Sequence, residues 1–137
     1  MKKIAVKTTS KNYQIYIGEG LSRKFNFDPI VNKREIFLLI DKNVPKKTIE
    51  DLKKNLKSSV PKRIIEKKIF ASEKNKNLTY VSKIYDFMLK KKLGRDCLVI
   101  GLGGGITCDI AGFISATYLR GVEFLLLPTT LLAQVDA

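Results

Sequence analysis

The chain has 137 residues, 45% of them hydrophobic and 28% charged, and its 26 Lys and Arg against 13 Asp and Glu give a formal net charge of +13 at pH 7. This length and composition predict one globular domain, residues 1–137, and exclude an intrinsically disordered protein. Histidine does not occur, so the chain cannot by itself supply a histidine-based metal site or a histidine general base.

The distribution of basic and apolar residues restricts the partners that we expect. Lysines are spread along the chain and arginine is scarce, which favours a solvated surface that attracts small polyanions over nucleic-acid binding. The most apolar run, 124–133, is too short to cross a membrane, and the first residues contain no stretch typical of a signal peptide. We therefore expect a cytoplasmic protein with no membrane partner, in which Cys97 and Cys108 are reduced and buried.

The first predicted elements form a hairpin. Residues 3–7 and 13–17 are expected to be strands, joined by the polar segment 8–12, and the second strand places Tyr13, Ile15 and Ile17 on one face. Glycines at 18 and 20 end the hairpin, and a short helical turn is expected at 21–25.

Strands and helices alternate over the rest of the chain. The apolar run 36–40, closed by Asp41, predicts a strand buried on both faces, and Pro45 precedes a helical stripe at 49, 52 and 56. Further strands are expected at 64–70, 97–101 and 124–127, and helices over 78–89 and within 103–118. The predicted fold class is α/β, with a Rossmann-like, mostly parallel sheet covered by helices on both faces. Ligands bind such sheets at the carboxyl ends of the strands.

Three consecutive glycines, 103–105, lie between a predicted buried strand and a predicted helix. The usual dinucleotide fingerprint would need a sixth-position glycine where the chain has Ile106. Glycine amides at a helix N-terminus still suit a pyrophosphate, whereas the alternative is a tight turn that needs glycine only for backbone freedom. The glycines alone leave both interpretations open.

Several polar side chains follow predicted strands. Asp41 could accept hydrogen bonds from a ribose and select NAD over NADP, or it could cap a turn. Glu73 and Lys76 could contact a ribose and a phosphate, or lie in a solvated loop, and Thr129 and Thr130 offer hydroxyl groups at another strand end.

The segments that carry these residues resemble the 3-dehydroquinate synthase family, in colinear order over essentially the whole chain. The specific part is C-terminal, with GGGITCDIAGF at 103–113, ATYLRG at 116–121 and PTTLLAQVD at 128–136. YIGEG at 16–20, DKNV at 41–44 and EKNK at 73–76 add weaker matches. The resemblance implies a Rossmann-like N-terminal domain that binds NAD.

The resemblance also implies roles for single residues. Asp41 and Glu73 would hold ribose, and Lys76 would lie near the cofactor. Asp136 would face both nicotinamide and substrate, and Arg120 would reach the phosphorus-bearing group of the substrate in the neighbouring subunit of a homodimer. The other implied cofactor contacts are Gly104, Gly105, Ile106 and Asp109 around the pyrophosphate, and Thr129, Thr130 and Leu132 on the adenine and ribose side.

The implied reaction is that of a carbon–oxygen lyase of the shikimate pathway. It cyclises 3-deoxy-D-arabino-heptulosonate 7-phosphate, a small phosphorylated sugar acid, to 3-dehydroquinate with loss of phosphate. NAD oxidises a ring hydroxyl transiently, and a divalent metal, zinc or cobalt, acts as a Lewis acid. The family's metal ligands, a glutamate and two histidines of a helical C-terminal domain, do not occur here. We therefore expect a chain truncated at its C-terminal edge, inactive alone, with weak NAD binding and exposed apolar surface near Leu131–Val135.

Other functions remain as alternatives. Within the superfamily these are a 2-deoxy-scyllo-inosose or valiolone synthase, and, less favoured by the context of Arg120 and Asp136, a glycerol-type polyol dehydrogenase. From a different class, the chain could be a non-catalytic nucleotide-binding or nucleic-acid-binding module.

Overall fold

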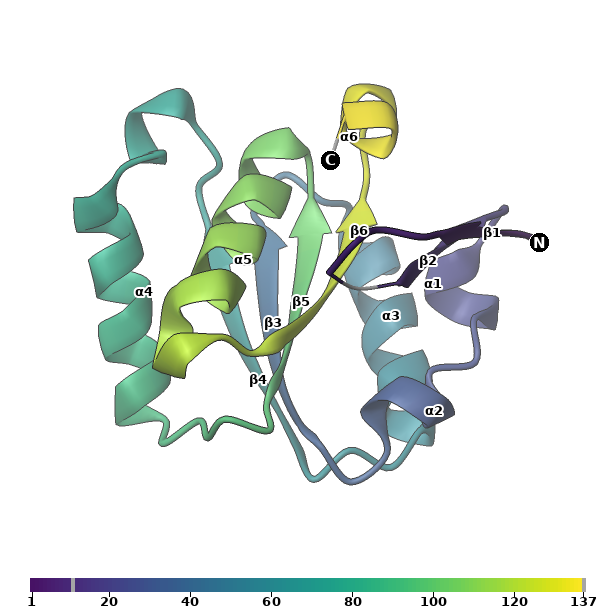
Figure 1. Ribbon diagram of the computed structural model, residues 1–137, viewed down its shortest axis with the longest axis horizontal. Helices are drawn as coiled ribbons and strands as arrows, with labels where there is room; N and C mark the ends of the chain where they lie inside the picture. The colour runs from purple at the N-terminus through teal and green to yellow at the C-terminus, as the bar shows by residue number, and fades with distance from the viewer. Residues whose placement is uncertain (11, 137) are drawn as a thin grey trace.

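The computed structural model describes residues 1–10 and 12–136, in which a small antiparallel hairpin precedes a parallel sheet with helices on both faces (Figure 1). In the hairpin, β1 (Lys2–Val6) pairs with β2 (Tyr13–Ile17). The parallel sheet has the strand order β4-β3-β5-β6. Its elements are β3 (Glu35–Asp41), α3 (Lys46–Ser58), β4 (Arg63–Ile69), α4 (Leu78–Lys90), β5 (Leu98–Gly103), α5 (Gly105–Thr117) and β6 (Glu123–Pro128). The predicted fold class is confirmed.

The core has two layers, one on each face of the sheet. Along β3, Ile36, Leu38 and Ile40 face α3, whereas Phe37 and Leu39 face α4 and α5, and all five side chains are fully buried. A central parallel strand covered on both faces is apolar at every position for this reason. Figure 1 shows α4 and α5 on the left of the sheet and α3 on its right.

Aromatic side chains connect the hairpin to the core. The ring centroids of Tyr16 and Phe25 are 4.7 Å apart, and those of Phe25 and Phe27 are 4.8 Å apart, both with edge-on geometry. Phe27 is buried in the layer beneath α3. The segment between β2 and β3 contains two short helices, α1 (Leu21–Lys24) and α2 (Asp28–Val31).

The strand order creates a switch point between β3 and β5. The chain leaves β3 through α3 toward β4 on one side, then returns through α4 to β5 on the other side of β3. Helices therefore leave the carboxyl ends of β3 and β5 on opposite faces of the sheet. In open α/β sheets this is where ligands bind.

Helix α5 lies directly against β5 because Gly101 has no side chain. A methyl group added at Gly101 would lie 2.7 Å from Cβ of Ala111 and 3.3 Å from Cδ2 of Leu126. Real side chains do not approach this closely, so the glycine allows helix and strand to touch.

Most element bounds agree with the sequence prediction within a few residues, but four short elements were not predicted. Helix α2 has four residues and α6 (Leu131–Asp136) has six, too few to show helical periodicity. The other two are 3-10 turns, η1 (Glu73–Asn75) and η2 (Tyr118–Arg120), and in η2 Leu119 and Arg120 have positive φ angles of 47° and 70°. Among the described residues, no helix is long and apolar enough to span a membrane.

We expect Gly101→Ala to lower the free energy of unfolding by about 1–3 kcal/mol, because the added methyl group overpacks the contact with Ala111. The control is Gly112→Ala on α5, next to Ala111, where the added methyl group meets nothing within 4 Å. This control should raise stability by about 0.5–1 kcal/mol, since alanine favours a helix over glycine. Urea denaturation measures both, and equal effects at the two positions would contradict the proposed contact.

Candidate functional site

The candidate site lies at the carboxyl edge of the parallel sheet, around the ends of β3, β5 and β6. Asp41 ends β3, Gly103 ends β5, and the backbone N–H of Thr129 donates to the carbonyl oxygen of Gly103 at 2.8 Å. This bond holds the segment after β6 against the glycine turn. Residues that the sequence predicts for cofactor binding are thereby brought to one edge.

Asp41 is nearly buried, with 8% of its surface exposed. Its Oδ1 accepts a hydrogen bond from the backbone N–H of Asn43 at 3.0 Å. Asp41 therefore does cap a turn, which was one of the two roles that the sequence left open. It engages one carboxylate oxygen, and the second makes no hydrogen bond with the described residues, so it can still accept one from a ligand.

Gly103 lets Asp41 and α5 approach each other closely. A methyl group added at Gly103 would lie 2.6 Å from Oγ1 of Thr107 and 2.9 Å from Cβ of Asp41. Thr107, which the sequence did not single out, is fully buried, and its hydroxyl finds no hydrogen-bond partner among the described residues. The only signal for it is its place two residues after the glycines.

The N-terminus of α5 is open. Gly104 occupies the N-cap position and provides no side-chain hydrogen bond, so the first N–H groups of the helix lack the usual cap. A methyl group added at Gly105 would meet nothing within 4 Å. Donors and partial positive charge at such an end suit an anion. Of the two interpretations of the glycines, tight turn and anion cradle, the geometry accommodates both.

An ion pair crosses this edge beside α5. Nζ of Lys76 lies 2.6 Å from Oδ2 of Asp109, with both side chains about half exposed. Lys76 follows the 3-10 turn η1 (Glu73–Asn75), which places Glu73 at the same edge. The hydrogen bond to Asp109 and its negative charge raise the pKa of Lys76 above its usual value.

Helix α6 borders the site on the β6 side. Thr130 lies beside Gly104, since a methyl group added there would be 3.3 Å from Cγ2 of Thr130. Oγ1 of Thr130 accepts a hydrogen bond from the N–H of Ala133 at 3.3 Å and so caps α6. Leu132 is 72% exposed. Asp136 ends α6, but its side chain lies outside the described part of the structure.

Arg120 is the predicted site residue that does not join this group. It follows the C-terminus of α5, and a helix of 13 residues spans about 20 Å, so Arg120 lies at the opposite edge of the sheet from Gly104. The turn that holds it is well anchored. The hydroxyl of buried Tyr118 donates to the carbonyl oxygen of Leu93 at 2.8 Å, and the N–H of Val122 donates to the carbonyl of Ser115 at 2.7 Å.

At the amino edge of the sheet, two arginine side chains form ion pairs that connect neighbouring elements. Arg34 pairs with Glu123, and Arg63 with Glu35, each at 2.6 Å between nitrogen and oxygen. Arg63 also donates to the carbonyl oxygens that follow α4. The arginines at the amino edge are therefore occupied by partners within the chain, whereas the N–H groups at the start of α5, at the carboxyl edge, lack a side-chain cap.

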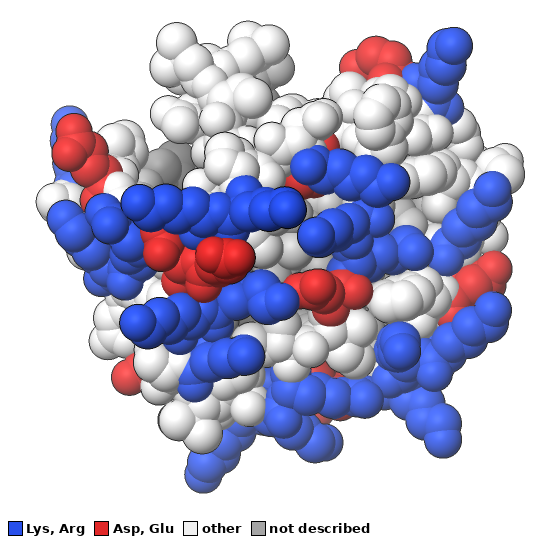
Figure 2. All heavy atoms as spheres, turned by 180° about the vertical axis from the view of Figure 1, so that it is seen from behind, with Lys and Arg blue, Asp and Glu red and all other residues white. Residues whose placement is uncertain are grey.

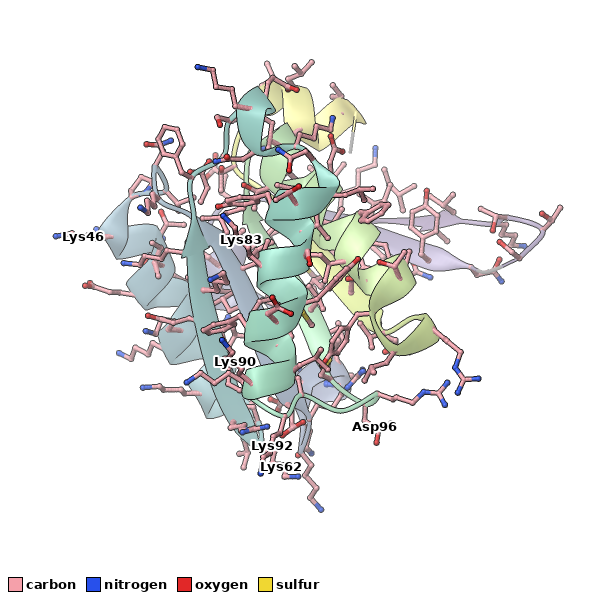
Figure 3. The ribbon with its side chains drawn as sticks, turned by 90° about the vertical axis from the view of Figure 1, so that its left-hand side faces the viewer. Lys46, Lys62, Lys83, Lys90, Lys92 and Asp96 are labelled. Atoms are coloured by element: carbon pink, nitrogen blue, oxygen red, sulfur yellow. The ribbon has the colours of Figure 1, made fainter. Side chains whose placement is uncertain are left out.

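Basic side chains cover the α3 side of the molecule, where acidic ones lie between them, while residues 131–135 of α6 carry no charged side chain (Figure 2). A hollow of about 430 Å³ on this side lies between α3 and β4. Figure 3 shows that the lysines do not form one stripe: Lys46 projects from α3, Lys83 and Lys90 lie along α4, and Lys62 lies at the amino edge. This scatter agrees with a solvated surface, and the expectation of no nucleic-acid partner stays a prediction.

Both cysteines are free and buried, as predicted. Burial raises the pKa of the Cys97 thiol and of the Cys108 thiol to about 11. Neither thiol is therefore a nucleophile at neutral pH.

The groups at the carboxyl edge are of the kinds that bind a dinucleotide, whereas the described residues include no cluster of potential metal ligands. The edge offers a buried carboxylate, an uncapped helix N-terminus and the Lys76 ammonium, which match a ribose and a pyrophosphate. No group of three or more Asp, Glu or Cys residues in the described part of the chain could hold a metal ion.

Comparisons with known proteins agree with one another. A family model described as "3-dehydroquinate synthase N-terminal" matches residues 66–137. The 3-dehydroquinate synthase of Pelagibacter ubique is 42% identical over 98% of this chain and 37% of its own length, and that of Alkaliphilus metalliredigens is 39% identical over all of this chain and 37% of its own. The chain thus spans little more than a third of these curated relatives.

Solved structures of two sugar-phosphate cyclases have the same fold. A 2-deoxy-scyllo-inosose synthase superimposes with a TM-score of 0.87 at 19% identity, over 98% of this chain and 38% of the other. The 2-epi-5-epi-valiolone synthase of Streptomyces hygroscopicus, solved with NAD+ and Zn2+, has a TM-score of 0.78 at 25% identity, over 97% of this chain and 36% of the other.

The unpaired hydroxyl of Thr107 leads to a prediction about the stability of the chain without a bound ligand. Thr107→Val keeps the shape and removes a buried group without a partner, so it should raise the free energy of unfolding by about 1 kcal/mol. The matched control is Ser115→Ala on the same helix, whose buried hydroxyl donates to the carbonyl of Ala111 at 2.6 Å. The control should lower stability by about 1 kcal/mol. A loss of stability in Thr107→Val, measured by urea denaturation, would mean that its hydroxyl does have a partner.

Proposed function

Because the chain belongs to the 3-dehydroquinate synthase family, we propose that it is the NAD-binding part of an enzyme that cyclises 3-deoxy-D-arabino-heptulosonate 7-phosphate to 3-dehydroquinate with release of phosphate. The observation that supports this most directly is the open N-terminus of α5 beside the buried carboxylate of Asp41 at the switch point. Membership of the family supports the reaction, and the groups at this edge support it as the binding place of the cofactor.

Different groups of the chain contact different parts of the cofactor. The free oxygen of Asp41 accepts hydrogen bonds from a ribose, with Glu73 at the same edge for the second ribose. The N–H groups around Gly104, Gly105 and Ile106 donate to the pyrophosphate, and Lys76 adds a positive charge. Thr129, Thr130 and Leu132 border the adenine and ribose side.

NAD, when bound, supplies a hydride acceptor that becomes the hydride donor later in the same turnover, so the net reaction needs no outside oxidant. Neutral and positive groups around the glycine turn orient it, and the buried position of Asp41 limits access of water to that contact. The metal of the family has no matching ligands among the described residues.

Another cyclase is the second candidate, because the solved structures of similar fold act in that class. One of them is a 2-deoxy-scyllo-inosose synthase solved with carbaglucose-6-phosphate, NAD+ and Co2+. Its identity to this chain is 18%, against 42% for the Pelagibacter relative. The higher identity favours 3-dehydroquinate synthase. We propose this activity for the whole protein, and we propose that the protein is cytoplasmic.

Arg120 fits a role in a second subunit. It lies about one helix length from Gly104, so it cannot reach a substrate bound beside the glycine turn of its own chain. We therefore propose a homodimer in which Arg120 of one protomer binds the phosphate group of the substrate held by its partner. An arginine suits this role because its planar guanidinium matches phosphate oxygens.

The Asp41 contact is tested by calorimetric titration of the chain with NAD+. Asp41→Asn keeps the oxygen that accepts from Asn43 but loses the charge, so NAD+ affinity should fall roughly tenfold while the preference over NADP+ narrows. Asp86→Asn, on the exposed side of α4, is the charge-matched control and should bind NAD+ as wild type does. Unchanged affinity in Asp41→Asn, or no NAD+ binding by the wild-type chain, would overturn the cofactor assignment.

The role of Arg120 is tested in chimeras in which this chain replaces the matching 37% of the Alkaliphilus relative. The unsubstituted chimera should form 3-dehydroquinate, and Arg120→Ala and Asp136→Asn chimeras should each be inactive. When the two are co-expressed, roughly a quarter of the activity should return, because half of the dimers are mixed and each of these holds one intact site.

No recovery from the co-expressed pair would show that Arg120 acts within its own chain. An unsubstituted chimera that folds but forms no 3-dehydroquinate would overturn the proposed reaction itself.

A further inference from the structure

The hairpin formed by β1 and β2 extends from the body of the molecule as an arm, drawn in faint purple in Figure 3. Its inner face is anchored, because Tyr16 packs against Phe25 and the Lys3 ammonium lies 5.7 Å from the centre of the Tyr16 ring. Residues that alternate with Tyr16 lie on the outer face. Because a two-stranded hairpin is only marginally stable alone, the arm depends on this anchor and on any contact that its outer face makes.

The outer face of the arm is almost entirely apolar. Ile4 lies directly opposite Ile15, Val6 lies directly opposite Tyr13, and Ile17 completes the row on β2. Ile4 is 36% exposed and Ile15 40%, while Tyr13 and Ile17 are about half exposed. A strand with one solvated face normally carries polar residues on that face. An apolar row on the exposed side therefore indicates a contact surface.

The two edges of the arm differ in charge. β1 carries Lys2 and Lys3, and Lys7 follows it directly, whereas no residue of β2 is charged. Lysines at a strand edge discourage another strand from pairing with it, so the β1 edge is protected. Every second residue of an antiparallel strand turns its N–H and C=O away from its partner, and β1 is the only strand of the described chain that pairs with β2. The other edge of β2 is therefore free to accept a strand.

We infer that β2 pairs antiparallel with β2 of a second copy of this chain, which joins the two hairpins into one four-stranded sheet. A net charge of +13 opposes self-association, so two copies meet most readily at a surface without lysines, such as the β2 edge. In the joined sheet the two β1 strands are three strand spacings apart, about 14 Å, which exceeds the Debye length of about 8 Å at physiological salt. Their lysines therefore repel each other little. This contact depends on neither the cofactor nor the reaction.

The apolar face determines the register of the pair. Residues directly opposite one another in an antiparallel pair lie on the same face. When Ile15 faces its own copy, Tyr13 faces Ile17 of the second copy, both apolar faces lie on one side, and all five residues of β2 overlap. A shift by one residue would turn one apolar face to the opposite side. The register has a two-fold axis at Ile15, as expected for a contact between identical chains.

Cysteine cross-linking of the full chain tests the inferred pairing. Ile15→Cys should form a disulfide-linked dimer in a mild oxidant, because residues directly opposite each other bring their Cβ atoms within about 5 Å. Ile4→Cys is the matched control, since Ile4 lies opposite Ile15 on the same face but about 14 Å from its own copy. It should stay monomeric on a non-reducing gel. Cys97 and Cys108 are buried and do not compete. Cross-linking of both variants to the same extent, or of neither, would overturn the inference.

Light scattering of charge variants gives a second readout. The wild-type chain should have twice the mass of one 15.5 kDa chain. Ile15→Lys should raise the dissociation constant at least about tenfold, because it brings two ammonium groups face to face, whereas Ile4→Lys on the outer strand should change it less than about twofold. Both side chains are exposed, so neither substitution disturbs the core.

Three other outcomes would contradict the pairing. The first is a wild-type chain that stays monomeric at the concentrations used for calorimetry, and the second is a dimer that Ile15→Lys leaves intact, which would place the contact on another surface. The third is an Ile15→Cys variant that cross-links as the free chain but not in the chimera with the Alkaliphilus relative, which would mean that another part of the whole protein covers β2.

Discussion

The contact between β5 and α5 is the constraint on which the rest of this structure depends. Because Gly101 and Gly103 lack side chains, Ala111 and Thr107 lie where a methyl group on the strand would otherwise be. The helix axis is thereby fixed close to the sheet, and its N-terminus opens at the ends of β3 and β5. The same close approach packs Cβ of Asp41 against the glycine turn. The sheet, the helix and the carboxylate are therefore not independent features, since displacement of one changes the others.

The parts of the fold that follow from local chemistry could be predicted. The uninterrupted apolar run of β3 indicates burial on both faces, and alternate side chains of that run do enter the two layers of the core. The hairpin and the helices α3 and α4 follow from alternation and helical periodicity. The short helices α2 and α6 could not be predicted, because their few residues are held by surrounding contacts rather than by their own pattern. The left-handed turn at Leu119 and Arg120 was missed because residues with a Cβ rarely adopt positive φ.

The candidate site also contains parts that could be predicted from the sequence and parts that could not. Asp41 and the glycines directly follow strands, so their place at the carboxyl edge could be inferred from a parallel sheet alone. The pairing of Lys76 with Asp109 could not, since a complete helix separates them in sequence. The distribution of charge is also a property of the whole chain. Arg120 is the only Lys or Arg after Arg95, so the side formed by α5, β6 and α6 is almost free of basic residues, and Phe113, Phe124 and Leu131 are exposed there.

In the turn that carries Arg120, stability and function favour different residues. Leu119, Arg120 and Gly121 have successive φ angles of 47°, 70° and 112°, and a left-handed residue with a side chain costs on the order of 1–3 kcal/mol. Glycine at position 120 would relieve part of this cost but would remove the guanidinium group. Selection for a more stable domain and selection for the arginine therefore act in opposite directions at one residue. In a directed-evolution experiment that rewards folding alone, this position would be among the first to lose its native side chain.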